Sequence, residues 1–302
     1  ALWLESDRMS HLLELVTQKS LDNQIEVVRN ERRQRYDNVP YGKARFALYE
    51  ALYPEGHPYR YLTIGRHEDL AGASLEDVKD FWRTWYVPAN ATLTIAGDFD
   101  PATIRATVAK WFGGMPPSKK PALVVVPPPA PRAARVEVTD AFAKLRQITW
   151  AFHSPANFAA GDAELDILAN ALGASGTGRL YKQLVHTQQL AQSVNVYQSG
   201  SQFSGMFAVT VTAQSGADLA AIERVVTEEL ARVRATPLED AELRRAVTLV
   251  EARMIYSLEG LMARANILQG YNHYLGAPDK LGWDLARYRQ ATPEGIRTTA
   301  AT

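Results

Sequence analysis

A run of prolines near the middle of the chain places the strongest limit on how it can fold. Seven prolines fall between residues 116 and 131, at positions 116, 117, 121, 127, 128, 129 and 131. Proline lacks a backbone N–H and its ring clashes with a preceding helical turn, so neither a helix nor a central strand is expected there. Proline-rich segments are instead extended and fairly stiff spacers. We therefore predict two domains, residues 1–115 and 132–302, joined by a linker over residues 116–131.

Composition excludes several classes of protein. Lys plus Arg and Asp plus Glu both number 33, so the balance of charge favours neither nucleic acid nor an anionic membrane as a partner. The absence of cysteine excludes disulfides, thiol catalysis and cysteine-ligated metal. No apolar run is long enough to span a membrane. The first residues already have a helical pattern, so the lack of a signal peptide says nothing about the compartment.

Apolar spacing and turn residues predict the secondary structure. Helices are expected over residues 1–19, 23–35, 43–52, 74–85, 101–111, 162–172, from 179, 218–235, 238–258 and 262–275. Strands are expected over residues 92–96, 135–138, 147–152, 191–197 and 206–212. This order mixes hairpin-like strands with blocks of helices. It predicts the α+β class rather than a doubly wound parallel sheet.

The two predicted domains share one pattern at an offset of 220 residues. The offset sets Glu31 against Glu251, both in predicted helices. A helix start at Ser74 lies 43 residues after the first glutamate, and one at Thr292 lies 41 residues after the second. Two structurally similar mixed α/β domains are therefore expected. On this reading the chain begins and ends inside a repeat.

Five segments resemble one known family in their order and spacing. The segments are Leu2–Met9, Val27–Arg32, Tyr53–Tyr59, Tyr86–Leu93 and Leu172–Tyr181, and the resemblance as a whole covers nearly the entire chain. The family is the pitrilysin/insulinase family of zinc peptidases. The resemblance implies a parent protein that is a zinc-dependent endopeptidase and cleaves unfolded peptides inside a clamshell.

The same resemblance assigns a metal ligand. The family binds zinc through an H-x-x-E-H motif, whose glutamate is the general base, and through a glutamate on a later helix. That later glutamate matches Glu31. Gln24 stands seven positions earlier, where the family often has a supporting glutamate, and it keeps hydrogen-bonding capacity without charge. Gln24, Val27, Val28 and Glu31 follow helical spacing along one face. Without the resemblance, Glu31 would be an ordinary solvated glutamate, and that alternative stays open.

The histidine pair of the motif is absent. Histidines occur at positions 11, 57, 67, 153, 186 and 273, and none belongs to H-x-x-E-H. The stretch His11–Leu15 is a near miss that ends in leucine. The segment of the second repeat that corresponds to the motif is Asp166–Asn170, which has no histidine and places the motif about 50 residues before residue 1. We therefore expect no catalytic residue in this chain, a general base upstream, Zn²⁺ in the parent and none bound by this chain alone.

Substrate-binding residues stay unidentified. The family uses an arginine and a tyrosine seven positions apart, on a domain without zinc, and the matching Val185 and Gln192 depart from that pattern. The chain therefore matches the zinc-bearing half. Its expected partners are a peptide substrate and a second half or partner subunit that completes the clamshell, with no nucleic acid. The bacterial periplasm is the first expectation for the compartment. Two alternatives remain: a non-catalytic family member acting as a structural or partner subunit, and an α+β binding module with an accidental resemblance.

Overall fold

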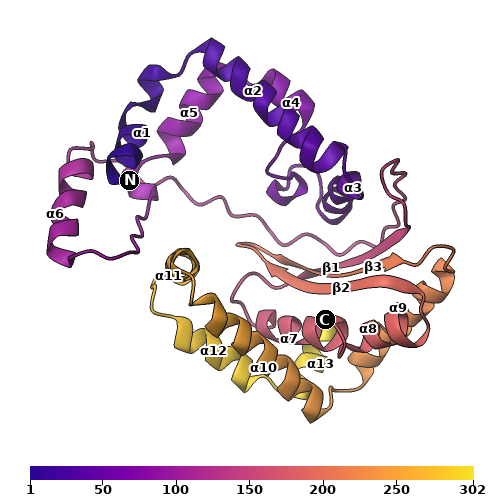
Figure 1. Cartoon of the computed structure of the whole chain (residues 1–302). Helices are drawn as coiled ribbons and strands as arrows, with labels where there is room; N and C mark the ends of the chain where they lie inside the picture. Colours follow the sequence, from indigo (N-terminus) through magenta and orange to yellow (C-terminus); the bar gives the residue numbers. More distant parts are fainter. The chain divides into compact units, whose positions relative to one another are not determined.

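The computed structural model describes residues 1–302, which group by contact into two units (Figure 1). The first unit comprises Ala1–Asn38 and Tyr61–Val125, and the second comprises Val39–Arg60 and Val126–Thr302. The break between Val125 and Val126 falls inside the proline-rich segment, where no helix or strand forms. Residues 39–60 belong to the second unit although both of their neighbours in sequence belong to the first.

The first unit is built of helices alone. Its elements are α1 (Leu2–Leu15), α2 (Gln18–Arg32), the π-helical turn η1 (Arg33–Asp37), α4 (His67–Gly72), α5 (Leu75–Trp85), the 3₁₀ turn η3 (Pro88–Asn90) and α6 (Pro101–Phe112). Side chains at the N-caps explain where three of them begin. Thr17 and Ser74 form capping boxes, and Asp100 accepts a hydrogen bond from the Thr103 backbone before the proline that opens α6.

Two predicted strands are not formed. Residues 92–96 are not a strand, because a strand is held by hydrogen bonds to a neighbouring strand and the first unit contains none. Residues 135–138 are likewise not a strand, and the side chains of Val136 and Val138 are exposed. Both predictions were wrong because local alternation shows only that a segment could pair, and pairing depends on the rest of the fold.

The first unit has almost no core of its own. Among its residues only Ser6 and Leu21 are buried. Its exposed large apolar side chains lie on several helices and loops: Trp3, Leu4, Leu15, Val27, Tyr61, Phe81, Trp85, Leu93, Phe99, Leu123, Val124 and Val125. Apolar helix faces of this kind normally pack against another element. The helices of this unit therefore present faces that nothing in the unit covers.

The second unit contains a three-stranded antiparallel sheet in the order β1-β3-β2. The strands are β1 (Gln147–Ser154), β2 (Ala191–Gly200) and β3 (Gly205–Ala213). The helices and helical turns are α3 (Gly42–Leu52), η2 (Pro58–Arg60), α7 (Asp162–Gly173), α8 (Arg179–Tyr181), η4 (Lys182–Thr187), α9 (Leu219–Ala235), α10 (Asp240–Ser257), α11 (Leu261–Leu275), α12 (Leu281–Gln290) and α13 (Pro293–Ala301). No helix of the chain is both long and apolar enough to cross a membrane.

The core of the second unit lies between the sheet and the helices α7 and α9. Leu168 and Leu172 of α7, Ile222 of α9 and Val209 and Val211 of β3 belong to one buried cluster. Successive strand residues point to opposite faces, so Met206 and Ala208 of β3 lie on the other face. They are buried too, because α3 and the loop after it cover that face (Figure 1).

Most of the predicted helices and three of the predicted strands are confirmed. The strands expected over residues 147–152, 191–197 and 206–212 correspond to β1, β2 and β3. The helix-rich architecture with a small sheet is of the expected α+β class. Helices α4 and α12 were not predicted: α4 has only six residues, and in α12 the helical spacing of Leu281, Leu285 and Tyr288 was missed.

The core packing predicts a large cost for truncating one side chain of α7. The change Leu168→Ala should destabilise the second unit by about 2–5 kcal/mol, because it leaves a cavity against β3 that the packed neighbours fill only in part. Hydrogen exchange of the β3 amides measures this loss. Leu268→Ala on α11 is the matched control, since Leu268 is exposed and its truncation should cost under about 0.5 kcal/mol. Equal effects of the two changes would contradict this packing.

Candidate functional site

Helix α2, which carries Glu31, is fixed at both of its ends. At its start, the Thr17 hydroxyl accepts a hydrogen bond from the Ser20 backbone, and the Ser20 hydroxyl accepts one from the Thr17 backbone at 2.8 Å. At its end, Arg32 donates to the carbonyl oxygen of Gly65 and pairs with Asp37. The backbone conformation of α2, and so the direction of its faces, is set by these contacts within the first unit.

Glu31 and Gln24 lie on an open face of α2. The Glu31 side chain is 40% exposed and forms an ion pair with Arg35 at 3.0 Å. Gln24 is exposed, and Val27 between them is 51% exposed. The structure therefore brings both predicted site residues onto one face, together with an apolar side chain that has no cover.

The chain alone does not make a complete zinc site. No group of three or more histidine, aspartate or glutamate side chains is placed to hold a metal ion anywhere in residues 1–302. A catalytic zinc site needs three protein ligands, and α2 offers one carboxylate. Two histidines of the first unit contact carboxylates away from Glu31. His67 forms a hydrogen bond with Asp37 at 3.0 Å, and the His11 ring lies 3.8 Å from the Glu14 carboxylate.

In the second unit, the position set against Glu31 has a cation partner. Glu251 on α10 forms an ion pair with Arg289 of α12 at 2.5 Å. Two residues further along α10, Arg253 donates to the side-chain oxygen of Asn170 on α7. Asn170 is the last residue of Asp166–Asn170, the segment that the 220-residue offset aligns with the expected zinc motif. The side chains of Arg289 and Arg253 therefore lie beside Glu251 and Asn170.

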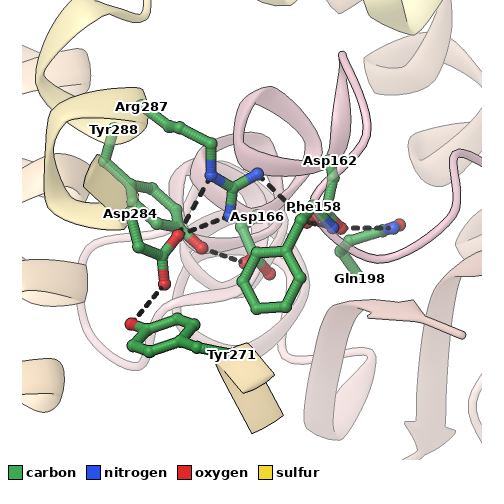
Figure 2. Close-up of polar contacts among 8 residues, drawn as sticks. All are labelled: Phe158, Asp162, Asp166, Gln198, Tyr271, Asp284, Arg287 and Tyr288. Atoms are coloured by element: carbon green, nitrogen blue, oxygen red, sulfur yellow. Dashed lines mark hydrogen bonds and ion pairs between the residues drawn. The ribbon is translucent and has the colours of Figure 1, made fainter. Parts of the chain in front are cut away.

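The first residue of that segment is also engaged. Asp166 of α7 accepts a hydrogen bond from the Tyr288 hydroxyl of α12 at 2.8 Å (Figure 2). Burial raises the pKa of Asp166 to about 6, although the bond from Tyr288 acts in the opposite direction and the nearby Asp162 carboxyl adds to the rise. Burial and the Asp166 charge in turn raise the pKa of the Tyr288 hydroxyl, which keeps it a donor at neutral pH.

A half-buried arginine joins α12 to α7 beside this pair (Figure 2). Arg287 contacts Asp284 at 2.6 Å and Asp162 at 3.3 Å, and its guanidinium lies over the Phe158 ring at 5.1 Å. The Tyr271 hydroxyl donates to Asp284 at 2.8 Å. These groups satisfy one another and hold α12 against α7.

Sequence reasoning missed this network. The residues that it joins are far apart in the chain, with 125 residues between Asp162 and Arg287. The only local signal is the alternation of charged and aromatic residues in Trp283–Arg289, and solvent-facing helices commonly show the same pattern. Burial of these charges depends on how α7 and α12 pack, which no local pattern reveals.

The second unit is thus an α+β fold without a group of side chains placed to hold a metal ion. The family model described as "Peptidase M16 inactive domain" matches residues 72–250, which is more than half of the chain. The chain belongs to the peptidase M16 family, which is the family of the pitrilysin/insulinase resemblance.

Known proteins resemble the chain over most of its length. "Zinc protease PqqE" of Helicobacter pylori is 24% identical over 249 residues, covering 82% of this chain and 56% of that protein. A crystal structure of a protease from Helicobacter pylori has a TM-score of 0.80 at 21% identity, covering 97% of this chain and 73% of the other. The first half of the periplasmic protease PqqL from Escherichia coli has a TM-score of 0.72 at 13% identity, covering 98% and 67%. The chain spans about half the length of the curated relatives it matches.

The raised pKa of Asp166 predicts a specific pH dependence of stability. A carboxyl whose pKa is raised by folding contributes stability below its unfolded pKa of 3.8, and this contribution is lost as the pH rises through about 6. The loss amounts to up to about 3 kcal/mol. Asp166→Asn should therefore gain stability relative to wild type between pH 4 and pH 8, measured by exchange of the β3 amides.

Asp162→Asn is the matched control. Asp162 accepts hydrogen bonds from the Phe158 backbone at 2.9 Å and from Gln198 at 3.2 Å and also pairs with Arg287. Its neutralisation should destabilise the unit across the whole range, because it leaves a buried cation with one partner fewer. A pH-independent effect of Asp166→Asn would contradict the raised pKa.

Proposed function

We propose that this chain is an internal piece of a zinc-dependent endopeptidase, in which Glu31 is one zinc ligand. The histidine pair and the general base would come from sequence before residue 1. The observation that carries the proposal is the open face of α2, where Glu31 lies beside the exposed Val27 and Gln24. The corresponding Glu251 is instead paired with Arg289. Glu31 pairs with Arg35 of the turn that directly continues its own helix, whereas Glu251 pairs with an arginine of a different helix.

The family membership and the names of the relatives support a hydrolytic parent. The curated relatives are named zinc proteases, and each is roughly twice as long as the part that this chain covers. The first unit, with one buried leucine and many exposed apolar side chains, needs further chain to cover its helices. We assign residues 1–115 to the C-terminal part of a zinc-bearing domain, 116–131 to a linker and 132–302 to a non-metal domain.

An internal repeat fits the order of the helices. At the offset of 220 residues, four helices of the first predicted domain have counterparts in the second: α1 with α9, α2 with α10, α3 with α11, and α5 with α13. The last pair begins in the same manner, since Ser74 and Thr292 both cap their helices through a side-chain oxygen. These shared bounds and caps are what one ancestral unit copied twice would retain.

The repeat gives the exposed face of α11 a specific partner. Helix α3 packs on the outer face of the sheet, next to β1. Its counterpart α11 exposes Leu261, Met262 and Leu268, and Met262 is 72% exposed. We infer that α11 covers the outer face of an equivalent sheet, formed by the sequence that precedes residue 1.

The remaining partners follow from the same proposal. A flexible peptide is the substrate, and a second half or partner subunit completes the enclosing clamshell. The PqqL structure is described as the first half of a periplasmic protease, which supports both a two-half arrangement and the bacterial periplasm as the compartment.

The proposal predicts opposite outcomes for two glutamates in the protein extended by its upstream sequence. Glu31→Gln should lower zinc affinity by more than about tenfold and reduce chelator-sensitive cleavage of a quenched peptide, because a neutral amide replaces a charged ligand. Glu251→Gln is the matched control and should leave zinc content unchanged. The 302-residue chain should hold no stoichiometric zinc in metal analysis.

Two results would redirect this assignment. If the Glu251→Gln protein lost zinc and the Glu31→Gln protein kept it, the metal site would lie in the second repeat and not in the first. An extended protein that lacks an intact motif and cleaves nothing would identify the chain as part of a non-catalytic structural or partner subunit.

The repeat predicts a change in the exposure of one methionine. In the 302-residue chain, hydroxyl radicals should oxidise Met262 rapidly, whereas the buried Met206 of β3 should react slowly. In the extended protein, Met262 should become protected to a level close to that of Met206. Unchanged oxidation of Met262 after the extension would show that α11 does not cover a second sheet.

A further inference from the structure

Residues 39–60, which we name the strap, form a separate layer on the outer face of the sheet in the second unit. Helix α3 makes up half of the strap and packs next to β1 (Figure 1). At its start, the Tyr41 backbone donates to Asp140 at 2.7 Å and the Tyr41 hydroxyl donates to the Leu145 carbonyl oxygen at 2.9 Å. At its end, the Tyr59 hydroxyl accepts from the Phe203 backbone at 3.1 Å.

Two histidines lie in the aromatic layer between the strap and the sheet. His57 of the strap is 4% exposed, and its ring stacks on Tyr53 at 4.7 Å. His153 of β1 meets the same Tyr53 ring edge-on at 5.4 Å, and Tyr59 meets the His57 ring at 5.3 Å. The strap is therefore held to the sheet through stacked rings, two of which can take up a proton.

The hydrogen bond that His57 accepts requires its imidazole to be neutral, and a protonated His153 would carry an N–H without an acceptor. His57 Nδ1 accepts from the Tyr59 backbone at 3.1 Å, so its proton is on Nε2, which is buried without a partner. His153 is hydrogen-bonded to the Leu52 backbone, and its Nδ1 is buried without a partner. A proton added to either ring would place a charge with no acceptor in an apolar layer, which is costly.

The charges around the two rings do not offset such a proton. Neither histidine forms an ion pair with a carboxylate. Arg60 donates to the carbonyl oxygens of Glu50 and Tyr53, which places a positive charge at the same end of α3. The other titratable groups that face this layer come from α3, the following loop and β2: Arg45, Tyr49, Tyr53, Tyr59 and Tyr197. Burial lowers the pKa of His57, and the nearby His153 lowers it further. Burial also lowers the pKa of His153, against the opposing effect of its bond to Leu52.

We propose that the strap is an acid-released latch, in which protonation of His57 and His153 detaches residues 39–60 from the sheet while the core between the sheet and α7–α9 stays folded. The core is independent of the strap, because it lies on the opposite face of β3 and contains no residue of the strap. Few residues of the strap are buried, namely Gly42, Tyr53 and His57.

The direction of the effect follows from proton linkage. When the strap is detached, His57 and His153 both regain the ordinary histidine pKa of about 6.5, whereas in the docked form they bind a proton less well. Docking is therefore constant above that pH and weakens as the pH falls below it. Each histidine contributes about a tenfold weakening for every unit by which docking lowers its pKa.

Hydrogen exchange of the 302-residue protein tests the latch. Between pH 7.5 and pH 5.0, after correction for the intrinsic exchange rate, amides of residues 42–60 should lose protection by about tenfold or more. Amides of β3, residues 205–213, should keep theirs. The double change His57→Gln and His153→Gln should abolish the pH dependence, because the amide side chains do not titrate. His273→Gln, at an exposed histidine of α11, should leave the response of the wild-type protein intact.

Three results would overturn the proposal. The first is a strap whose protection is the same at both pH values. The second is a parallel loss of protection in β3, which would show global acid unfolding. The third is an acid release that persists in the double variant. If the double variant fails to dock at pH 7.5, titration of the wild-type imidazole protons by NMR decides. His57 and His153 must then titrate below the ordinary histidine value of about 6.5 and in step with strap exchange, and ordinary titration of both would contradict the latch.

Discussion

Burial of β3 on both of its faces organises the second unit. The strand lies between β1 and β2, with Val209 and Val211 turned toward α7 and α9 and with Met206 and Ala208 turned toward the strap. Because side chains alternate along a strand, a shift of one residue in register would exchange the two sets and uncover both layers. The register that pairs His153 with Met206 therefore also decides where the strap can meet the sheet.

The second unit joins two of its helices through internal charges, where the proposed parent would use a metal in the first. In the second unit, Arg287 with Asp162 and Asp284, and Tyr288 with Asp166, tie α12 to α7. Buried ion pairs add little net stability, but their geometry specifies how two helices sit against each other. In the proposed parent, a zinc ion bound by Glu31 would join α2 to an upstream helix. A metal and a set of internal charges would then serve the same structural purpose in the two copies.

Part of the candidate site could be predicted from the sequence, because it depends on one helix. The spacing of Gln24, Val27 and Glu31 places them on one face of α2 wherever that helix packs. The contact between Tyr288 and Asp166 in the second unit could not be predicted, because the two residues lie 122 positions apart and meet only through packing of α12 on α7. The same reason explains the missed burial of His57, whose loop has no apolar pattern of its own.

The sequence by itself determined most of the helices, since capping residues such as Thr17, Ser74 and Asp100 and apolar periodicity act within a few residues. It also determined that the proline-rich segment would form neither helix nor strand. The tertiary structure decided which segments became strands and which unit the strap joined. Residues 92–96 and 206–212 both alternate in sequence, but only the second segment has partners on both sides. Strand pairing and burial are non-local, so they depend on contacts that no short stretch of sequence contains.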